Sequence, residues 1–173
     1  MSESVLTKQA IERLSSDFEI KQEVIGHNAF YNKDVRIDLM LRAKPHLVQH
    51  GFINEWFGVE CKWAEGVNGQ TAKTTKAVWQ AITYAQSTFN INGAISVPRF
   101  VAVLTPNLEP LIEQHISTLL QLSLYGCVAR MYFYKDGNWG IKFASIYSRS
   151  GPSIGEYYVS KRQLPKYRAG SIA

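Results

Sequence analysis

The sequence predicts an α/β or α+β fold, in which helices flank one central mixed β-sheet. Two segments, VRIDLML (35–41) and WFGVECKW (56–63), alternate apolar and polar side chains with the period of two that is typical of strands. Other segments repeat their apolar residues at helical spacing, and the Asp-Gly pair within 135–138 is a strong signal for a β-hairpin. Helices and strands that alternate in this way pack as layers around a shared core.

The first part of the chain predicts one helix followed by three strands. Residues 3–16 form an amphipathic pattern whose apolar side chains share one broad face: Leu6, Ala10, Ile11 and Leu14. The short mixed segment 17–26 predicts a strand and a turn. The alternating segments 35–41 and 56–63 predict two further strands, separated by a loop.

The second part predicts two long helices, a buried strand and a hairpin. Residues 74–89 repeat apolar side chains at helical spacing: Val78, Ala81, Ile82, Ala85 and Phe89. Residues 100–105 predict a buried strand, and residues 109–124 predict a second helix. The apolar segments 128–134 and 139–145 flank the Asp-Gly pair and predict the two arms of a C-terminal hairpin.

The composition favours a single folded domain over residues 1–173. Hydrophobic residues make up 46% of the chain and charged residues only 19%, which excludes a disordered protein. No run approaches the roughly 18 apolar residues of a membrane span, and the acidic, amphipathic start differs from a signal peptide. Cys61 and Cys127 stand far apart without a CxxC pair, which argues against a zinc site or a disulfide framework. We therefore expect a cytoplasmic protein with no membrane association.

The net charge of +5 is concentrated in a basic C-terminal tail that begins at about residue 149. Beyond that position five basic residues stand against Glu156 alone: Arg149, Lys161, Arg162, Lys166 and Arg168. A basic segment favours a polyanionic partner such as DNA, although a solvated terminus explains the same charges equally well.

Three ionisable side chains in the alternating strands predict a chemical site. Asp38 leaves the polar face of its strand, and Glu60 and Lys62 leave one face of the next strand because side chains two apart point the same way. If the strands are neighbours, Asp38 and Glu60 can share Mg²⁺ or Mn²⁺, which prefer oxygen ligands. Lys62 beside such an ion can orient a water molecule or neutralise charge on a phosphate. The pattern therefore predicts metal-assisted phosphodiester hydrolysis.

The alternative for Glu60 and Lys62 is a surface ion pair on an exposed sheet face. The flanking apolar residues of segment 56–63 make that strand central, and charged side chains on a central strand are costly unless they are paired or functional. This comparison favours a functional site.

The arrangement of Asp38, Glu60 and Lys62, with apolar strands around both halves of the motif, resembles the PD-(D/E)XK nuclease superfamily. The matching motif here is Asp38 followed by Glu60-Cys61-Lys62. Ile37 stands where the superfamily motif has its proline.

Two helices extend this resemblance to roughly residues 3–125. Glu12, in the helix before the first matching strand, is similar to a glutamate that archaeal Holliday-junction resolvases of the superfamily place there. Gln80 and Tyr84 resemble the Q-x3-Y helix of exonuclease-type members.

The resemblance implies a restriction-endonuclease-like core and a Mg²⁺-dependent DNA nuclease, with Mn²⁺ able to substitute. It implies that Asp38 and Glu60 hold the metal with the backbone carbonyl of Cys61. Lys62 would position the attacking water or help to deprotonate it, and Glu12 would support the metal or its water shell. Hydrolysis would be an in-line attack that leaves 5′-phosphate and 3′-hydroxyl ends.

The helix at 74–89 supplies the candidate substrate-binding residues. Lys76, Gln80 and Tyr84 share one face at a spacing of four residues, opposite the apolar stripe. This face either is solvated or overlooks a substrate cleft, where Gln80 would hold a phosphate or the water network. Lys73 is a further candidate for a phosphate contact.

Several alternatives stay open from the sequence. The chain is either an enzyme or a catalytically silent module of the same fold that binds nucleic acid or a protein. The substrate is branched DNA, duplex DNA or RNA, and a homodimer is expected if cutting is sequence-specific. Glu19 and Glu23 compete with Glu12 for its role. No GxxxxGK[ST] motif is present, so we expect no nucleotide cofactor.

Overall fold

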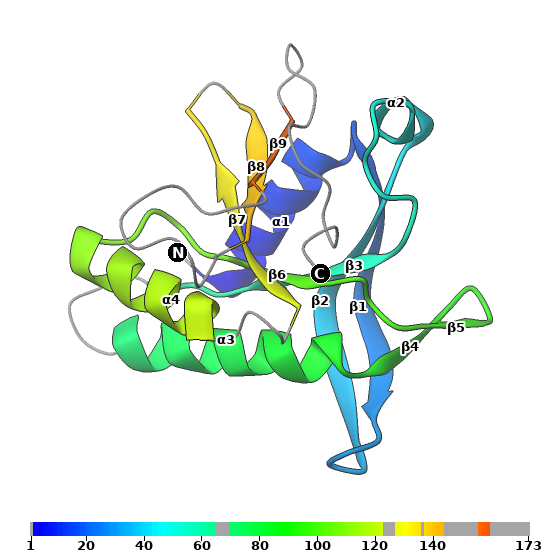
Figure 1. Cartoon of the computed structure of the whole chain (residues 1–173), viewed down its shortest axis with the longest axis horizontal. Helices are drawn as coiled ribbons and strands as arrows, with labels where there is room; N and C mark the ends of the chain where they lie inside the picture. The colour runs from blue at the N-terminus through cyan, green and yellow to red at the C-terminus, as the bar shows by residue number, and fades with distance from the viewer. Residues whose placement is uncertain (1, 65–69, 123–126, 136, 144–155, 160–173) are drawn as a thin grey trace.

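The computed structural model describes residues 2–64, 70–122, 127–135, 137–143 and 156–159 (Figure 1). The helices are α1 (Glu3–Leu14), α2 (Pro45–Gln49), α3 (Gln70–Ala85) and α4 (Pro110–Leu122). The strands are β1 (Phe18–Asn28), β2 (Lys33–Ala43), β3 (Phe57–Cys61), β4 (Thr88–Ile91), β5 (Ala94–Ser96), β6 (Val101–Leu104), β7 (Val128–Phe133), β8 (Trp139–Lys142) and β9 (Glu156–Val159). The predicted arrangement of helices around a mixed sheet is confirmed.

Within the described ranges the strands form one nine-stranded sheet in the order β5-β4-β1-β2-β3-β6-β7-β8-β9. The pairs β3–β6 and β6–β7 are parallel and the other neighbours are antiparallel. Strand β3 is the middle strand, and all five of its residues are buried. The prediction that this segment is a central strand is therefore confirmed.

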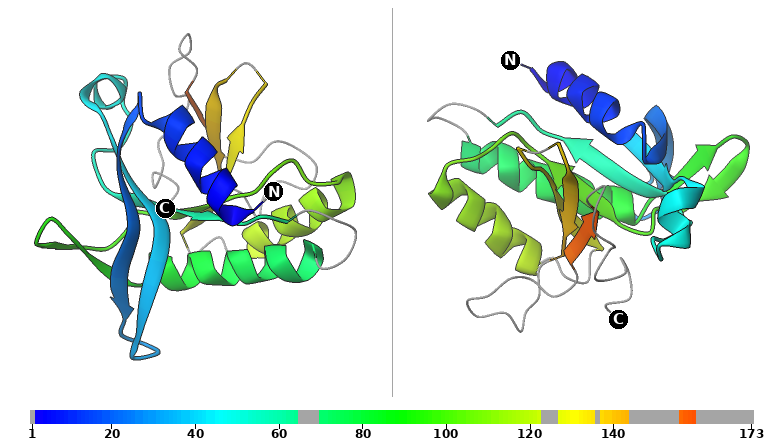
Figure 2. Two further views of the ribbon diagram at one scale, coloured as in Figure 1. Left: turned by 180° about the vertical axis from the view of Figure 1, so that it is seen from behind. Right: turned by 90° about the horizontal axis from the view of Figure 1, so that it is seen from above.

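The helices cover the two faces of the sheet (Figure 2). On one face, the apolar stripe of α1 joins side chains of β2, β3, β6, β7 and β8 in a core that contains Leu39, Cys61 and Leu104. On the other face, α3 and α4 pack against Met40, Val103 and Val128. The face that α1 covers is the α1 side of the sheet, and the face that α3 and α4 cover is the α3 side.

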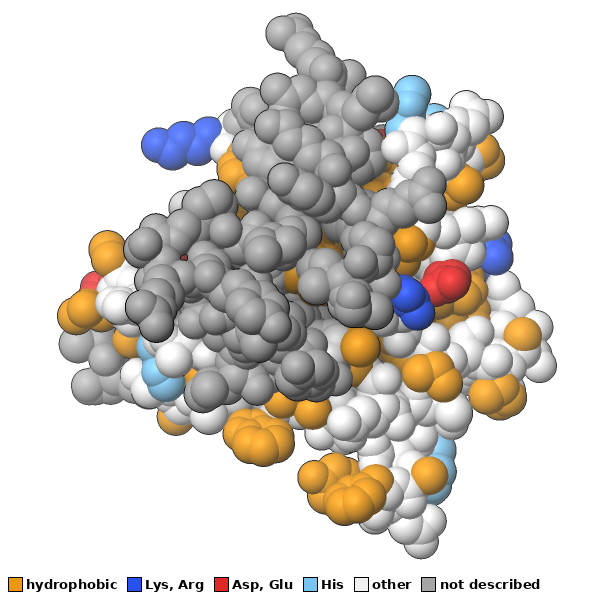
Figure 3. All heavy atoms as spheres, viewed as in Figure 1, with side chains coloured by type: hydrophobic (Ala, Val, Ile, Leu, Met, Phe, Trp, Pro, Cys, Tyr) orange, Lys and Arg blue, Asp and Glu red, His pale blue; other side chains and the backbone are white. Residues whose placement is uncertain are grey.

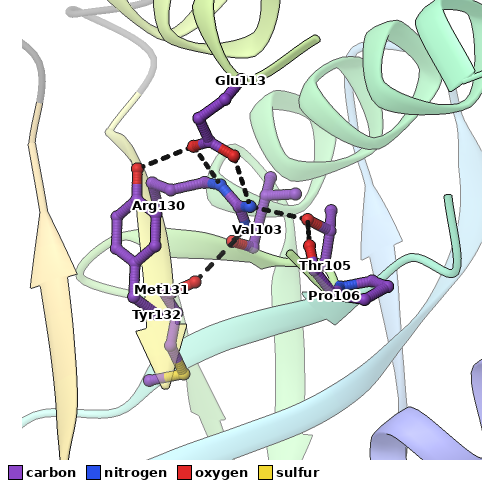
Figure 4. Close-up of polar contacts among 7 residues, drawn as sticks. All are labelled: Val103, Thr105, Pro106, Glu113, Arg130, Met131 and Tyr132. Carbon is purple, nitrogen blue, oxygen red and sulfur yellow. Dashed lines mark hydrogen bonds and ion pairs between the residues drawn. The ribbon is translucent and has the colours of Figure 1, made fainter. Parts of the chain in front are cut away.

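A buried arginine fixes α4 to the α3 side of the sheet (Figure 4). Arg130 on β7 is 2% exposed and donates to both carboxylate oxygens of Glu113 on α4, at 3.3 and 3.2 Å. It also donates to the hydroxyl of Thr105 (2.6 Å) and the carbonyl of Val103 (3.1 Å) on and beside β6. The Tyr132 hydroxyl donates to Glu113 as well (2.9 Å). Because the partners come from β6 and its end, from β7 and from α4, this network holds these three elements together.

Several boundaries differ from those expected. Helix α3 begins and ends four residues before the predicted range 74–89, and Phe89 lies in β4 rather than on the helix. Strands β4 and β5 form a hairpin that was not predicted, although the dipeptide Asn92-Gly93 favours a hairpin turn. Asn92 and Gly93 both adopt positive φ angles (54° and 83°), as the turn of a tight hairpin requires.

Two further elements were not predicted, and one strand is longer than predicted. Helix α2 occupies what was expected to be a loop, with Pro45 as its first residue. Strand β1 continues to Asn28, two residues beyond the predicted strand and turn. Strand β9 lies within the segment that we expected to be a basic tail, and it pairs with β8. The five basic residues of that segment fall outside the described residues, and so do residues 65–69.

In the parts of the chain that the structure describes, no helix combines the length and the apolar character needed to cross a membrane.

Replacing Glu113 with Ala should destabilise the fold by about 3–5 kcal/mol, because the buried Arg130 guanidinium would lose its carboxylate partner. The measurement is the free energy of unfolding in urea. Glu109→Ala is the matched control, since Glu109 is an exposed acid immediately before α4, and it should cost less than about 0.5 kcal/mol. Equal losses in both variants would show that the Arg130 network does not stabilise the fold.

Candidate active site

Asp38 and Glu60 meet at the point where β2 and β3 separate. The register pairs Leu39 with Val59, so the next position along the two antiparallel strands places Asp38 opposite Glu60. Beyond this point the backbone N–H of Cys61 donates to the Asp38 carboxylate (2.8 Å). The Asp38 carboxylate thus accepts from a backbone N–H of β3 just beyond the last paired residues of β2 and β3, and this hydrogen bond fixes the carboxylate beside β3. The prediction that the two strands are neighbours is confirmed.

The backbone is irregular around Asp38. Leu39 and Leu41 pack on the α1 side, as alternation requires, but Ile37 packs with Met40 on the α3 side. Strict alternation, which the sequence pattern predicted through residues 35–41, therefore fails between Ile37 and Leu39. The register of β1 with β2 places Glu23 opposite Asp38, and Glu23 has a left-handed backbone with φ of 48°. A left-handed residue in a strand marks a local distortion, and here it lies beside the candidate site.

The two carboxyl groups interact directly in a buried environment. Glu60 is only 4% exposed, and burial together with the nearby Asp38 charge raises the pKa of Glu60 from 4.5 to about 8. Burial also raises the pKa of Asp38, although the Cys61 N–H opposes that shift. The side chains share a hydrogen bond that raises the pKa of Glu60 and lowers that of Asp38. Glu60 therefore carries the proton and donates it to Asp38 at neutral pH.

Two buried side-chain oxygens have no hydrogen-bond partner among the described residues: Oε2 of Glu60 and Oε1 of Gln80. Such atoms are rare, because leaving a buried polar atom unpaired costs free energy. The amide of Gln80 donates to the hydroxyl of Tyr84 (3.2 Å), which orients the side chain. Burial and the negative charge of Glu60 raise the pKa of Tyr84 to about 12, so this phenol stays protonated. The site thus presents oxygen atoms that lack a donor or a cation.

Lys62 lies close to the carboxyl pair and is paired with Glu3, the first residue of α1. The ammonium of Lys62 is 2.9 Å from a Glu3 carboxylate oxygen, and its side chain is only 14% exposed. The charge of Lys62 lowers the pKa of both Asp38 and Glu60, whereas that of Glu3 raises both. The motif's lysine and a third carboxylate therefore flank the pair.

Glu12 does not reach this cluster. It lies nine residues after Glu3 in the same helix, which places it about 13 Å further along and on the opposite face. Its side chain is exposed, and the glutamate of α1 that pairs with Lys62 is Glu3. The two competing glutamates are engaged elsewhere, since Glu19 pairs with Arg42 (2.7 Å) and Glu23 pairs with Arg36 (3.1 Å).

Glu3 could have been found from the sequence. On a helical projection it lies within about 20° of Ala10 and Leu14, so it continues the apolar stripe toward the N-terminus of the helix. An acid on the buried face of a helix needs a partner, and the motif's lysine is the cation that it meets.

Cys61 points away from the carboxyl pair. It is 1% exposed on the α1 side, where its thiol interacts with the hydroxyl of Thr7 on α1, and burial raises the pKa of that thiol. This burial follows from the alternation in segment 56–63, which turns Cys61 to the face opposite Glu60 and Lys62.

A cleft of about 780 Å³ leads to the site between the β1–β2 hairpin and α3. Its lining includes Asp38 and Glu3, together with Lys76, Gln80 and Tyr84 of α3. The predicted face of this helix therefore overlooks a cleft rather than open solvent. Lys73 is exposed and does not line it.

The donor set fits a hydrated Mg²⁺ ion better than a preformed metal cage. Within the described ranges, no three His, Cys, Asp or Glu side chains are gathered around one point. Mg²⁺ commonly uses one or two carboxylates and keeps several waters, and Asp38 with the unpartnered Glu60 oxygen matches that requirement. Binding would require Glu60 to lose its proton.

Comparison with known proteins gives no match: no protein-family model, curated protein or solved structure is similar to this chain. The functional proposal therefore depends on the geometry of the chain's own residues.

The pKa of Glu60 predicts how stability depends on pH in the metal-free protein. Between about pH 4.5 and 8 the folded state keeps a proton that the unfolded state has lost, so the free energy of unfolding should fall as pH rises. The slope is about 1.4 kcal/mol per pH unit where this one proton differs fully. Urea titrations in EDTA between pH 5 and 9 measure it. In Glu60→Gln this slope should be absent, and a slope that persists would contradict the assignment.

Glu3 and Glu12 should differ in the same titration. Because the charge of Glu3 raises the pKa of Glu60, Glu3→Gln should move the loss of stability to lower pH. Glu12→Gln is the matched control from the same helix and should leave the profile unchanged. A shift with Glu12→Gln but not with Glu3→Gln would show that the other glutamate faces the pair.

Proposed function

We propose that the protein is a divalent-metal-dependent nuclease that hydrolyses DNA phosphodiester bonds. The observation that carries this proposal is the pair of half-buried Asp38, which lines the cleft, and buried Glu60, whose Oε2 atom has no hydrogen-bond partner among the described residues. Burying a carboxyl pair that keeps a proton at neutral pH and leaves one oxygen without a hydrogen bond costs folding free energy. Such a cost is expected where a site is built to bind a charged ligand.

Each residue has a distinct role in this proposal. Asp38 and Glu60 hold the cation, and the Cys61 N–H keeps Asp38 in place. A bound divalent cation supplies Lewis-acid activation of the phosphate and of a water molecule. Lys62 neutralises charge that develops on the phosphate, and its ion pair with Glu3 determines where its ammonium lies. Gln80 presents its free oxygen to the water network.

The order of elements also supports a restriction-endonuclease-like core and membership of the PD-(D/E)XK superfamily. The aspartate strand and the ExK strand are antiparallel neighbours, and the ExK strand continues into parallel pairing with β6 and β7. Helix α3, which carries Gln80, packs on the side of the sheet to which Glu60 points. These relations support the sequence resemblance in fold as well as in motif.

A catalytically silent binding module is the second candidate, and one observation favours it. Lys62 is occupied by Glu3, and the described part of the chain offers no third metal ligand that is free. In that case the carboxyl pair would remain protonated and the cleft would only bind its partner.

The two candidates differ in metal-dependent cleavage. Labelled single-stranded, duplex, forked and four-way DNA should be incubated with Mg²⁺, Mn²⁺, Ca²⁺ or EDTA. We expect cleavage with Mg²⁺ or Mn²⁺ only, and a loss of at least about 100-fold in Asp38→Asn, Glu60→Gln and Lys62→Ala. Glu109→Ala should retain the wild-type rate.

The folding of every variant is checked by its urea transition, so that lost activity is not lost structure. DNA binding without cleavage under all metals would reject the nuclease and favour the silent module. Cleavage that survives in Glu60→Gln would place the chemistry elsewhere.

A further inference from the structure

We propose that the cleft binds unpaired DNA bases by stacking them on Tyr31 and Trp79. The substrate of the proposed nuclease would then be DNA with a single-stranded segment next to the cleaved phosphate. The inference rests on the proposed function for the chemistry at Asp38, but base binding itself can be tested without cleavage.

Exposed aromatic side chains gather at this cleft. In the described residues, the aromatic side chains that are strongly exposed are Phe30 (85%), Trp79 (61%) and Tyr31 (60%). Tyr31 and Trp79 line the cleft, and the ring of Phe30 packs edge-on against Tyr31 with centroids 5.0 Å apart. Figure 3 shows separate hydrophobic groups along the lower edge of the molecule, where α3 and the β1–β2 hairpin lie. Exposed aromatic rings that gather beside a cleft mark a candidate binding surface.

The tip of the hairpin is held in place rather than free. Asn28, which is completely buried at the end of β1, accepts from the backbone N–H of Tyr31 (3.0 Å). Its amide donates to the carbonyl of Thr83 (3.1 Å) and to the hydroxyl of Ser87 (3.0 Å), at the end of α3. Asn28 thus connects the turn that carries Tyr31 to the helix that carries Trp79. A platform fixed in this way loses little conformational entropy when a base stacks on it.

The lining of the cleft carries three cations that can contact the phosphates of a polynucleotide, beside the acids Glu3, Asp34 and Asp38. Lys33 and Lys76 line it, and neither has an ion-pair partner in the described part of the chain. Arg36 also lines it, in an exposed pair with Glu23. Phosphates would contact these cations while bases stack on the rings, the combination typical of single-strand binding. An apolar protein segment would leave the lysines without a partner.

Stacking requires bases whose faces are accessible. In a continuous duplex the base faces are covered by neighbouring base pairs, and only groove edges and phosphates reach the protein. The cleft volume of about 780 Å³ lies within the range of roughly 300–1,000 Å³ for pockets that enclose small ligands, which suits individual nucleotides. Because Asp38 lines the same cleft, an unpaired segment held there places a neighbouring phosphate near the carboxyl pair.

Fluorescence anisotropy in EDTA measures binding without cleavage. The probes are a labelled single strand, a forked duplex and a blunt duplex of the same sequence. Tyr31→Ala and Trp79→Ala should each weaken binding of the single strand and the fork about 5- to 100-fold, since one stacked base is worth about 1–3 kcal/mol. Binding of the blunt duplex should change less than about 2-fold. Trp79→Phe, which keeps an aromatic face, should retain most of the affinity.

Leu111→Ala is the matched control, because Leu111 is an exposed apolar side chain (77%) on α4 outside the cleft. It should leave all three affinities unchanged. Equal losses on single strand and blunt duplex, or no loss in either alanine variant, would overturn the stacking inference. If Mg²⁺-dependent cleavage persists in that case, the stacking inference fails while the proposed nuclease function stands. Absence of both DNA binding and cleavage in the wild type would reject the nuclease as well.

Discussion

The rest of the structure depends on the burial of two carboxyl groups in the middle of the sheet. Glu60 occupies the central strand, where surrounding side chains exclude water from it, and Asp38 meets it from the neighbouring strand. A low-polarity setting opposes two adjacent negative charges, so the pair holds a proton unless a cation replaces it. The protonation state, the proposed metal requirement and part of the conformational stability are therefore consequences of one placement.

Much of this placement could be predicted from local sequence. Alternation in 35–41 and 56–63 identified the two strands, and the charges at Asp38, Glu60 and Lys62 stood out against apolar neighbours. Two-residue periodicity is a local property, so it needs no knowledge of the fold. The same alternation accounts for Cys61, whose side chain lies on the opposite side and packs against α1.

The remaining features depend on distances that the sequence does not contain. The apolar stripe of α1 points to Glu3 as an acid that needs a partner, but its match to Lys62 depends on how α1 crosses the sheet, and the resemblance drew attention to Glu12 instead. The break in alternation at Ile37 arises where β1 is distorted at Glu23, a residue without a special sequence signal. Arg130 looked like an ordinary strand residue, and only the tertiary fold brings Glu113 to it. Phe89 was assigned to the helix because it continues the helical spacing of the apolar residues before it, although it lies in the next strand, β4.

The attachment of the β1–β2 turn to α3 separates recognition from chemistry. Asn28 is anchored to Thr83 and Ser87, while the residues beyond it only form the turn. Changes in the length or composition of this turn would therefore alter the substrate preference of the proposed nuclease without disturbing Asp38, which lies ten residues after Asn28. Selection could in this way diversify substrate preference in descendants of this protein while the carboxyl pair stays constant. The fold thus allows specificity to evolve independently of the reaction.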